Sequence, residues 1–131
     1  MSIPVDLAAL AEALSRHDVS YLLTSGQERP HVAEIFPELV DGVLVIAEPG
    51  RTARRVVGDH PAVTVLLPPG SRGGYTLLID GTASLDADGA LHISPSHAVL
   101  HRAAAHGRQE GDGAAAESAC GNDCRPLDAQ A

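Results

Sequence analysis

Three arginines and a threonine gather in the five-residue stretch Arg51-Thr52-Ala53-Arg54-Arg55. In a helix, Arg51 and Arg55 lie four positions apart and share one face, with Thr52 beside them. Guanidinium groups, a hydroxyl and the free N–H groups of a helix start are donors that bind phosphate. The stretch therefore predicts a phosphate site, and the alternative is a solvated basic face that offsets nearby carboxylates.

Four histidines, at positions 92, 97, 101 and 106, could supply metal ligands. His97 and His101 are four residues apart, which is a metal-binding spacing if the segment is helical. No carboxylate accompanies the pair at a fixed offset. This favours a solvated helix face, and no metal site is assigned.

Cys120 and Cys124 have a C-x-x-x-C spacing near the end of the chain. A zinc site needs two further ligands at definite spacing, and only scattered histidines are available. A local redox pair, a metal site shared across a dimer and a tail without a role all stay open. No nucleophile elbow, Walker loop or dinucleotide fingerprint is present, so catalytic residues remain unknown.

The composition limits the partners of the chain. Its 131 residues suit one domain, and its net charge of -8, with arginine as the sole strongly basic residue type, repels nucleic acid and anionic membranes. No secretory signal precedes the first helix, and no apolar run approaches the roughly 20 residues of a membrane helix. We expect a cytoplasmic protein without a disulfide framework.

The remaining sequence pattern alternates turns with short periodic segments. Asp6 is a good helix N-cap, followed by an apolar stripe at Leu7, Leu10, Ala11 and Leu14. Asp41-Gly42 is a strong hairpin signal. The segments expected after the first helix are strands over 19–24, 31–40, 43–47, 62–67, 75–85 and 90–94, and short helices over 51–57 and 95–102.

Six short strands with tight turns favour a small, mainly β protein with short helices, built as a closed or partly closed antiparallel barrel. The first three strands should be neighbours in the sheet. Residues 1–102 are the expected barrel domain. Residues 103–131 are rich in Ala, Gly and acidic residues, so we expect a flexible tail.

Four segments in this order give the chain a family resemblance. They are Arg29-Pro30-His31-Val32 after a polar turn, the polar run from Glu48 to Arg55 after a hairpin strand, Asp59-His60-Pro61-Ala62-Val63-Thr64-Val65, and the long strand from Tyr75 to Ala83. In order and spacing they resemble the pyridoxamine 5'-phosphate oxidase-like family. That family has a six-stranded antiparallel FMN-binding split β-barrel.

The resemblance implies a homodimer with FMN in a groove at the interface and an oxidoreductase that acts on a small organic substrate. It implies cofactor binding by Arg51, Thr52, Arg54, Arg55 and His31. Tyr75 could stack near the flavin ring or simply pack. Such proteins leave the chemistry to the flavin, and the protein holds and tunes it.

Three alternatives remain beside FMN-dependent oxidation. A deazaflavin or a haem could replace FMN, since the chain has no Lys beside the arginines and Glu48 stands near them. The protein could also be a non-catalytic module that binds or senses a flavin or haem. A metal-binding role through the C-terminal Cys and His residues is a third hypothesis.

Overall fold

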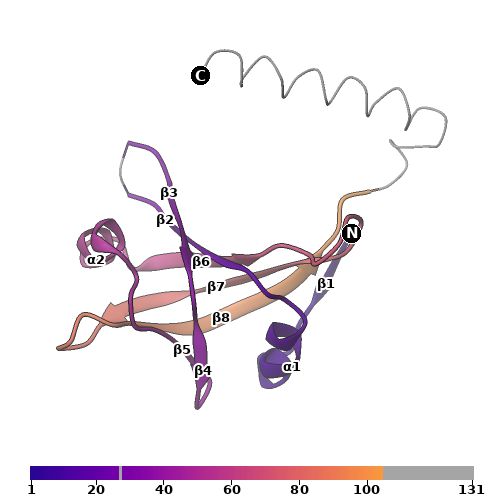
Figure 1. Cartoon of the computed structure of the whole chain (residues 1–131), viewed down its shortest axis with the longest axis horizontal. Coiled ribbons are helices and arrows are strands. Elements are labelled where there is room, and N and C mark those ends of the chain that lie inside the picture. Colours follow the sequence, from indigo (N-terminus) through magenta and orange to yellow (C-terminus); the bar gives the residue numbers. More distant parts are fainter. Residues whose placement is uncertain (27, 105–131) are drawn as a thin grey trace.

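One antiparallel sheet of eight strands forms the body of the protein (Figure 1). The computed structural model describes residues 1–26 and 28–104. The sheet order is β3-β2-β6-β7-β8-β5-β4, and β1 pairs with β8 outside this path. The strands are β1 (Ser2–Pro4), β2 (Ser20–Thr24), β3 (His31–Ile35), β4 (Glu38–Val40), β5 (Val43–Ile46), β6 (Ala62–Leu67), β7 (Thr76–Leu85) and β8 (Leu91–His101).

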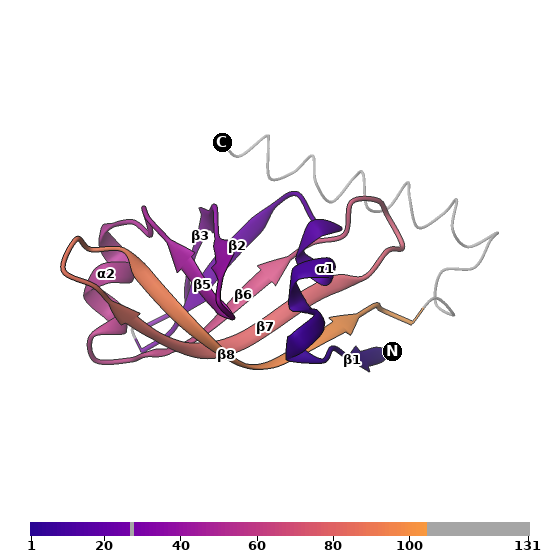
Figure 2. The same cartoon turned by 90° about the horizontal axis from the view of Figure 1, so that it is seen from below.

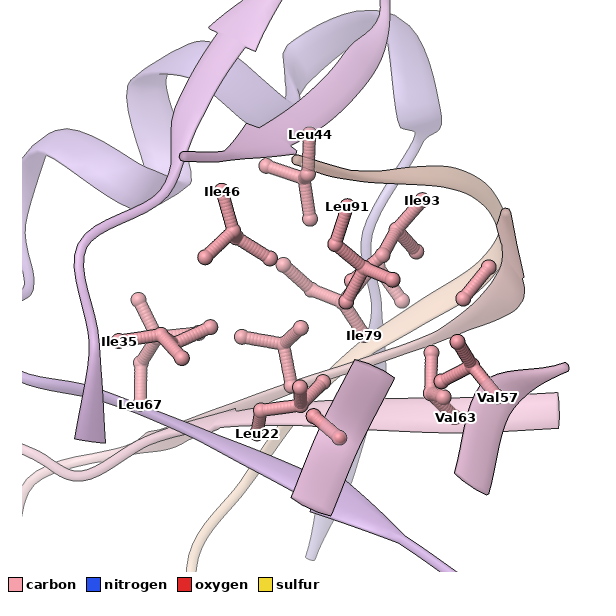
Figure 3. Packing of buried hydrophobic residues seen from close by; sticks show 14 of the residues in the cluster. Leu22, Ile35, Leu44, Ile46, Val57, Val63, Leu67, Ile79, Leu91 and Ile93 are labelled. Atoms are coloured by element: carbon pink, nitrogen blue, oxygen red, sulfur yellow. The ribbon is translucent and has the colours of Figure 1, made fainter. Parts of the chain in front are cut away.

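The sheet curls so that its inward face forms a single aliphatic core. Side chains alternate between the two faces of a strand, so every second residue of β2, β6 and β7 is buried. Figure 3 shows the inward residues of several strands and of one helix pointing toward one another. Those labelled there are Leu22, Ile35, Leu44, Ile46, Val57, Val63, Leu67, Ile79, Leu91 and Ile93.

Two short helices lie toward opposite ends of this sheet (Figures 1 and 2). A 3₁₀ turn, η1 (Leu7–Ala9), leads into α1 (Leu10–Ser15), and α2 (Arg51–Val57) precedes β6. The predicted N-cap is confirmed, because the Asp6 carboxylate accepts a hydrogen bond of 3.0 Å from the Ala8 amide. Within the described residues, no helix has the length and apolar character to cross a membrane.

The segment expected as one strand over 31–40 is two strands on opposite edges of the sheet. It breaks at Phe36-Pro37, between β3 and β4. Three residues span at most about 10 Å, so the Ile35–Glu38 step keeps the two edges close and nearly closes the barrel. The single strand expected over 31–40 is therefore wrong, while the expected antiparallel pairing of consecutive strands is confirmed by the β2–β3 and β4–β5 hairpins.

The helix expected over 95–102 is also wrong, because that segment belongs to the long strand β8. Pairing along eleven residues, with β7 on one side and β5 and β1 on the other, outweighs the local Ser94-Pro95 cap signal. The register of β7 against β8 shifts at one point, because Asp80 pairs with His97 while the next residue, Gly81, pairs with Pro95. Ser96 is therefore the extra residue of a β-bulge. Pro95 thus sits where a strand tolerates it.

The sheet has eight strands where six were expected, because β1 was not predicted and because the segment 31–40 forms two strands. The prediction of an antiparallel, mainly β fold is confirmed. The expected tail over 103–131 lies largely outside the described residues. The domain boundary at residue 102 therefore stays a prediction.

The bulge gives a test of this packing. A Cβ on Gly81 would lie 2.5 Å from the Ser94 carbonyl oxygen and 2.8 Å from Ile93 Cγ2, and backbone cannot move aside cheaply. We expect Gly81→Ala to lower the free energy of unfolding by about 1–3 kcal/mol, as overpacking does. The measurement is the urea midpoint. Gly70→Ala is the control, because nothing lies within 4 Å of its Cβ position; equal midpoints for the two variants would contradict this packing.

Candidate functional site

Helix α2 is fixed to the barrel through its apolar face. Ala53 is fully buried, and Val56 and Val57 are nearly so. The helix follows a buried proline and Gly50, whose φ of 94° lies in the region that favours glycine. This anchoring turns the opposite face of α2, with its basic residues, toward solvent.

The structure divides the three arginines of α2 into two kinds. Arg51 and Arg55 are exposed, and neither forms an ion pair within the part of the chain that the structure describes. Thr52 is partly exposed beside them. Arg54 instead turns toward the barrel, where its Nε donates a hydrogen bond of 2.9 Å to the Gly89 carbonyl. Arg51, Thr52 and Arg55 therefore remain available to a ligand, while Arg54 has a structural partner.

The turn that receives Arg54 is itself braced by Asp86. Its carboxylate accepts hydrogen bonds from the amides of Asp88 at 2.8 Å and Ala90 at 3.0 Å. His92 Nε2 lies 2.9 Å from its second oxygen, and this bond is the main reason that the pKa of Asp86 lies below its ordinary value of 3.8. The β7–β8 turn is thus a fixed point against which α2 is held.

His31 begins the edge strand β3 and is directly paired with Thr24 on β2. Paired residues share a face of the sheet, so the His31 side chain lies on the face that carries Leu22 and Ile35. Thr24 is 2% exposed, and its hydroxyl has no hydrogen-bond partner among the described residues. A buried hydroxyl left in this state costs free energy that a ligand could recover.

The turn after β2 lies against the segment that follows α2. Gly26 has a φ of 105°, and a Cβ there would fall 2.2 Å from the His60 ring. Helix α2 also contacts β2 directly. His31, Thr24 and the basic helix therefore lie at the same end of the barrel.

A groove of 490 Å³ runs over the outer face of the sheet near this end. Its volume is in the range of small-molecule sites. Asp80 supplies a carboxylate, to which the Thr64 hydroxyl donates a bond of 2.6 Å. The negative charge at Asp80 makes that part of the groove unsuited to phosphate. Its lining residues are Leu23, Thr24, Ser25, Pro30, Ala62, Val63, Thr64, Asp80, Gly81, Thr82 and Ser96.

None of the predicted cofactor residues lines the groove just described. Arg51, Thr52 and Arg55 share the exposed side of α2, and His31 is not among the groove residues. Tyr75 lies at the opposite end of β7, where its hydroxyl donates to the sulfur of Met1.

Sequence reasoning missed Thr24, His60 and Asp80. A signal existed for Thr24, since it is a polar residue at an inward position of an alternating strand. His60 and Asp80 stood in the segments that carried the family resemblance, but nothing in the local pattern singled out their side chains.

The histidines proposed for a metal lie on β8 and not on a helix. His97 Nδ1 is 3.8 Å from Asp80, and His101 Nδ1 is 3.1 Å from the Ser2 hydroxyl, so they have different neighbours. Within the described ranges, no group of three or more His, Cys, Asp or Glu could hold a metal ion. His106, Cys120 and Cys124 lie outside the described residues.

Comparison with known proteins identifies relatives and shared folds. No protein-family model matches the chain. The uncharacterized proteins Mb0449c of Mycobacterium bovis and MT0457 of Mycobacterium tuberculosis are each 32% identical to it, over 92% of both chains.

Three solved structures share its fold at low sequence identity. A candidate pyridoxamine 5'-phosphate oxidase from Listeria innocua has a TM-score of 0.62 and 21% identity, over 74% of this chain and 98% of that one. FAD-binding proteins from Mesorhizobium loti and Mycobacterium smegmatis have TM-scores of 0.61 and 0.58, with 13% and 10% identity. They cover 79% and 78% of this chain, and 98% and 100% of their own. The expected split-barrel fold is therefore confirmed.

The division of the arginines is testable by truncation. We expect Arg54→Ala to lower the free energy of unfolding by about 1–2 kcal/mol, because the Gly89 carbonyl loses its donor and the helix its tether. Arg55→Ala should change it by less than about 0.5 kcal/mol, as at an exposed site. Urea unfolding of both variants is the measurement. Equal effects would mean that the Arg54 bond contributes nothing.

Proposed function

The chain belongs to the same family as the two mycobacterial proteins and has the pyridoxamine 5'-phosphate oxidase-like split-barrel fold, and on this premise we propose that it binds a flavin nucleotide. The observation that carries the proposal is the fold match to two FAD-binding proteins along nearly their whole length. FMN is the first candidate, with FAD next because the matched proteins bind it. A deazaflavin or a haem remains the alternative.

The phosphate end of the flavin is proposed to lie on the exposed side of α2. Arg51 and Arg55 carry two cationic groups that no described carboxylate neutralises, and Thr52 adds a hydroxyl. Charge-assisted hydrogen bonds from guanidinium to phosphate are among the stronger polar contacts. Glu48 is exposed and so is free to turn away from a bound anion.

Two further features fit a neutral, flat group next to that anion. The outer groove combines apolar walls with hydroxyls, which suits a ring system that carries a few polar atoms. Its volume of 490 Å³ also lies in the range of small-molecule sites. When bound, the flavin supplies electron and hydride chemistry, and the residues of this chain hold and orient it.

A second copy of the chain is proposed to complete the site. On one chain the groove residues do not include those of α2, so one flavin would meet the helix of one protomer and the groove of the other. The bend between the sheet edges offers an apolar surface for this contact. Phe36 is 79% exposed, Val32 is 55% exposed on β3, and Val40 is 46% exposed on β4.

With a bound flavin, the proposed activity is oxidation or reduction of a small organic molecule. A second candidate is a flavin carrier without turnover. Two of the matched structures are FAD-binding proteins that are not named after a reaction, which favours this candidate as a separate hypothesis. Anaerobic addition of NADH or NADPH distinguishes them, because a bound flavin that neither donor reduces is the result expected of a carrier.

The first test is the absorption spectrum of purified protein after incubation with FMN, or with FAD, and removal of the excess by filtration. We expect flavin bands to be retained. Arg51→Glu and Arg55→Glu should each weaken binding about tenfold or more, since a charge-assisted hydrogen bond is replaced by repulsion.

Arg16→Glu is the matched control for this test. It makes the same change in net charge on α1, at the other end of the sheet, where Arg16 pairs with Glu12 at 3.0 Å. We expect flavin affinity within about twofold of wild type, since exposed pairs contribute little. Unchanged affinity in the α2 variants would remove the phosphate assignment. A Soret band would indicate that the protein binds haem instead of a flavin. A protein that stays colourless would refute the proposal that it binds a flavin.

The second test concerns the homodimer. Light scattering should give twice the chain mass, and Phe36→Asp should shift the protein toward the monomer while the circular dichroism spectrum still shows a folded chain, because Phe36 is exposed on the isolated chain. Ser71→Asp, at an exposed loop position, is the control and should leave the mass unchanged. A wild-type monomer, with or without FMN, would contradict the proposed shared site.

A further inference from the structure

His17 lies directly after α1 and joins the helix to the start of β7. Its Nδ1 is 3.0 Å from the Ala13 carbonyl oxygen, within its own helix. Its Nε2 is 3.1 Å from the Tyr75 carbonyl oxygen, 58 residues further along the chain. The imidazole is partly buried between them. One ring therefore spans the junction between α1 and the barrel.

Both partners of this ring are carbonyl oxygens, which accept hydrogen bonds and never donate them. A neutral imidazole has one N–H and can satisfy only one of the two carbonyls. The other nitrogen would then present its lone pair to an oxygen lone pair. Only the imidazolium, with an N–H on each nitrogen, makes both bonds at once.

Tyr75 is the fixed side of the junction. Its hydroxyl donates to the Met1 sulfur at 3.3 Å, and the Arg102 guanidinium lies 4.6 Å from the centre of its ring. The amino group of Met1 donates to the Arg102 carbonyl at 2.9 Å. These contacts hold the Tyr75 side chain against Met1 and Arg102, at the ends of β1 and β8, so we expect a change at His17 to act on the helix.

Other charged groups surround the ring without bonding to it. Asp6, Glu12 and Arg16 share one cavity with His17, and Asp18 shares a second cavity with it. Asp6 caps η1, and Glu12 pairs with Arg16, so these carboxylates already have partners. On the barrel side, the charged group that faces Tyr75 is Arg102.

We propose that His17 is a protonation-dependent latch for α1. The protonated ring fastens the helix to the Tyr75 carbonyl, and loss of one proton releases one of the two bonds. When α1 is packed on the barrel, the His17 ring binds a proton on each nitrogen. The hydrogen bonds that hold the helix are therefore all present at low pH, and one of them is lost as the pH rises. The latch is independent of the proposed flavin site, which lies at the other end of the sheet.

Release of the latch affects two cavities and one core residue. His17 lines both the cavity of 390 Å³ beside Phe36 and Leu39 and the cavity of 290 Å³ beside Val5 and Leu100. Leu10 of α1 is 2% exposed. Loosening of α1 would join the two cavities and uncover Leu10, giving the barrel an apolar opening at this end as pH rises.

The protonation state is read directly from long-range ¹H–¹⁵N correlations of the imidazole rings. At about pH 7 a free histidine side chain is mostly neutral. We expect His17 to carry a proton on both nitrogens under the same conditions. A His17 ring with one unprotonated nitrogen at that pH would overturn the proposal.

The effect on the helix is measured by amide hydrogen exchange, corrected for the intrinsic pH dependence of exchange. Protection of α1 should fall by about threefold to tenfold between about pH 6 and about pH 8, which is the size of one ordinary hydrogen bond. His17→Gln keeps a donor but does not titrate, so its protection should change by less than about twofold over this range.

His97→Gln is the matched control, because it removes an imidazole from the exposed face of β8 and should leave the response of α1 intact. The same pH response in wild type and His17→Gln would overturn the latch even if both proteins are folded. If His17→Gln does not fold, the ring-nitrogen measurement on the wild-type protein decides alone. Whether the protein binds a flavin does not affect either test of the His17 latch.

Discussion

A single sheet that must bury its own inward face determines the rest of this structure. Within residues 1–26 and 28–104 there is no second layer of sheet and only two short helices cover its ends, so the sheet shelters its aliphatic side chains by curling. Curling brings the two edge strands together, and the two residues between β3 and β4 carry the chain across the remaining gap. Edge strands are liable to pair with other chains, and a curled sheet with its edges close together lowers that exposure.

Local signals in the sequence predicted the elements that local chemistry controls. Asp6 caps a helix because its side chain reaches an amide two residues away. Asp41 and Gly42 form a hairpin turn because both adopt positive φ, as their residue types allow. These features depend on neighbours in the chain, so a pattern can reveal them.

The errors arose where partners distant in the chain decide the structure. Ser94-Pro95 reads as a helix start, yet β7 on one flank and β5 and β1 on the other hold it extended. The run 31–40 reads as one strand, yet the closure of the barrel requires a corner in it. In both cases the competing information is a pairing between segments that no local window contains.

The candidate site shows the same division. The sequence placed three arginines together, but the role of Arg54 is set by the Gly89 carbonyl, 35 residues away. The helix thus offers a pair of cationic groups where the sequence suggested a triplet. Thr24 and His31 are partners across a hairpin, and their shared face was predictable only once the register of β2 and β3 was known.

The pairing of β1 with the end of β8 has a consequence for how the chain can be rearranged. Met1 and Arg102 exchange two backbone hydrogen bonds of 2.9 Å, so the first residue of the chain and the end of the last strand lie side by side. A short linker could join these points without crossing the barrel. New ends could then open at the exposed Asp41-Gly42 turn between β4 and β5, which makes the domain suited to circular permutation. A permuted chain would have its strands in a different order along the sequence and would keep the same strand pairing in the sheet.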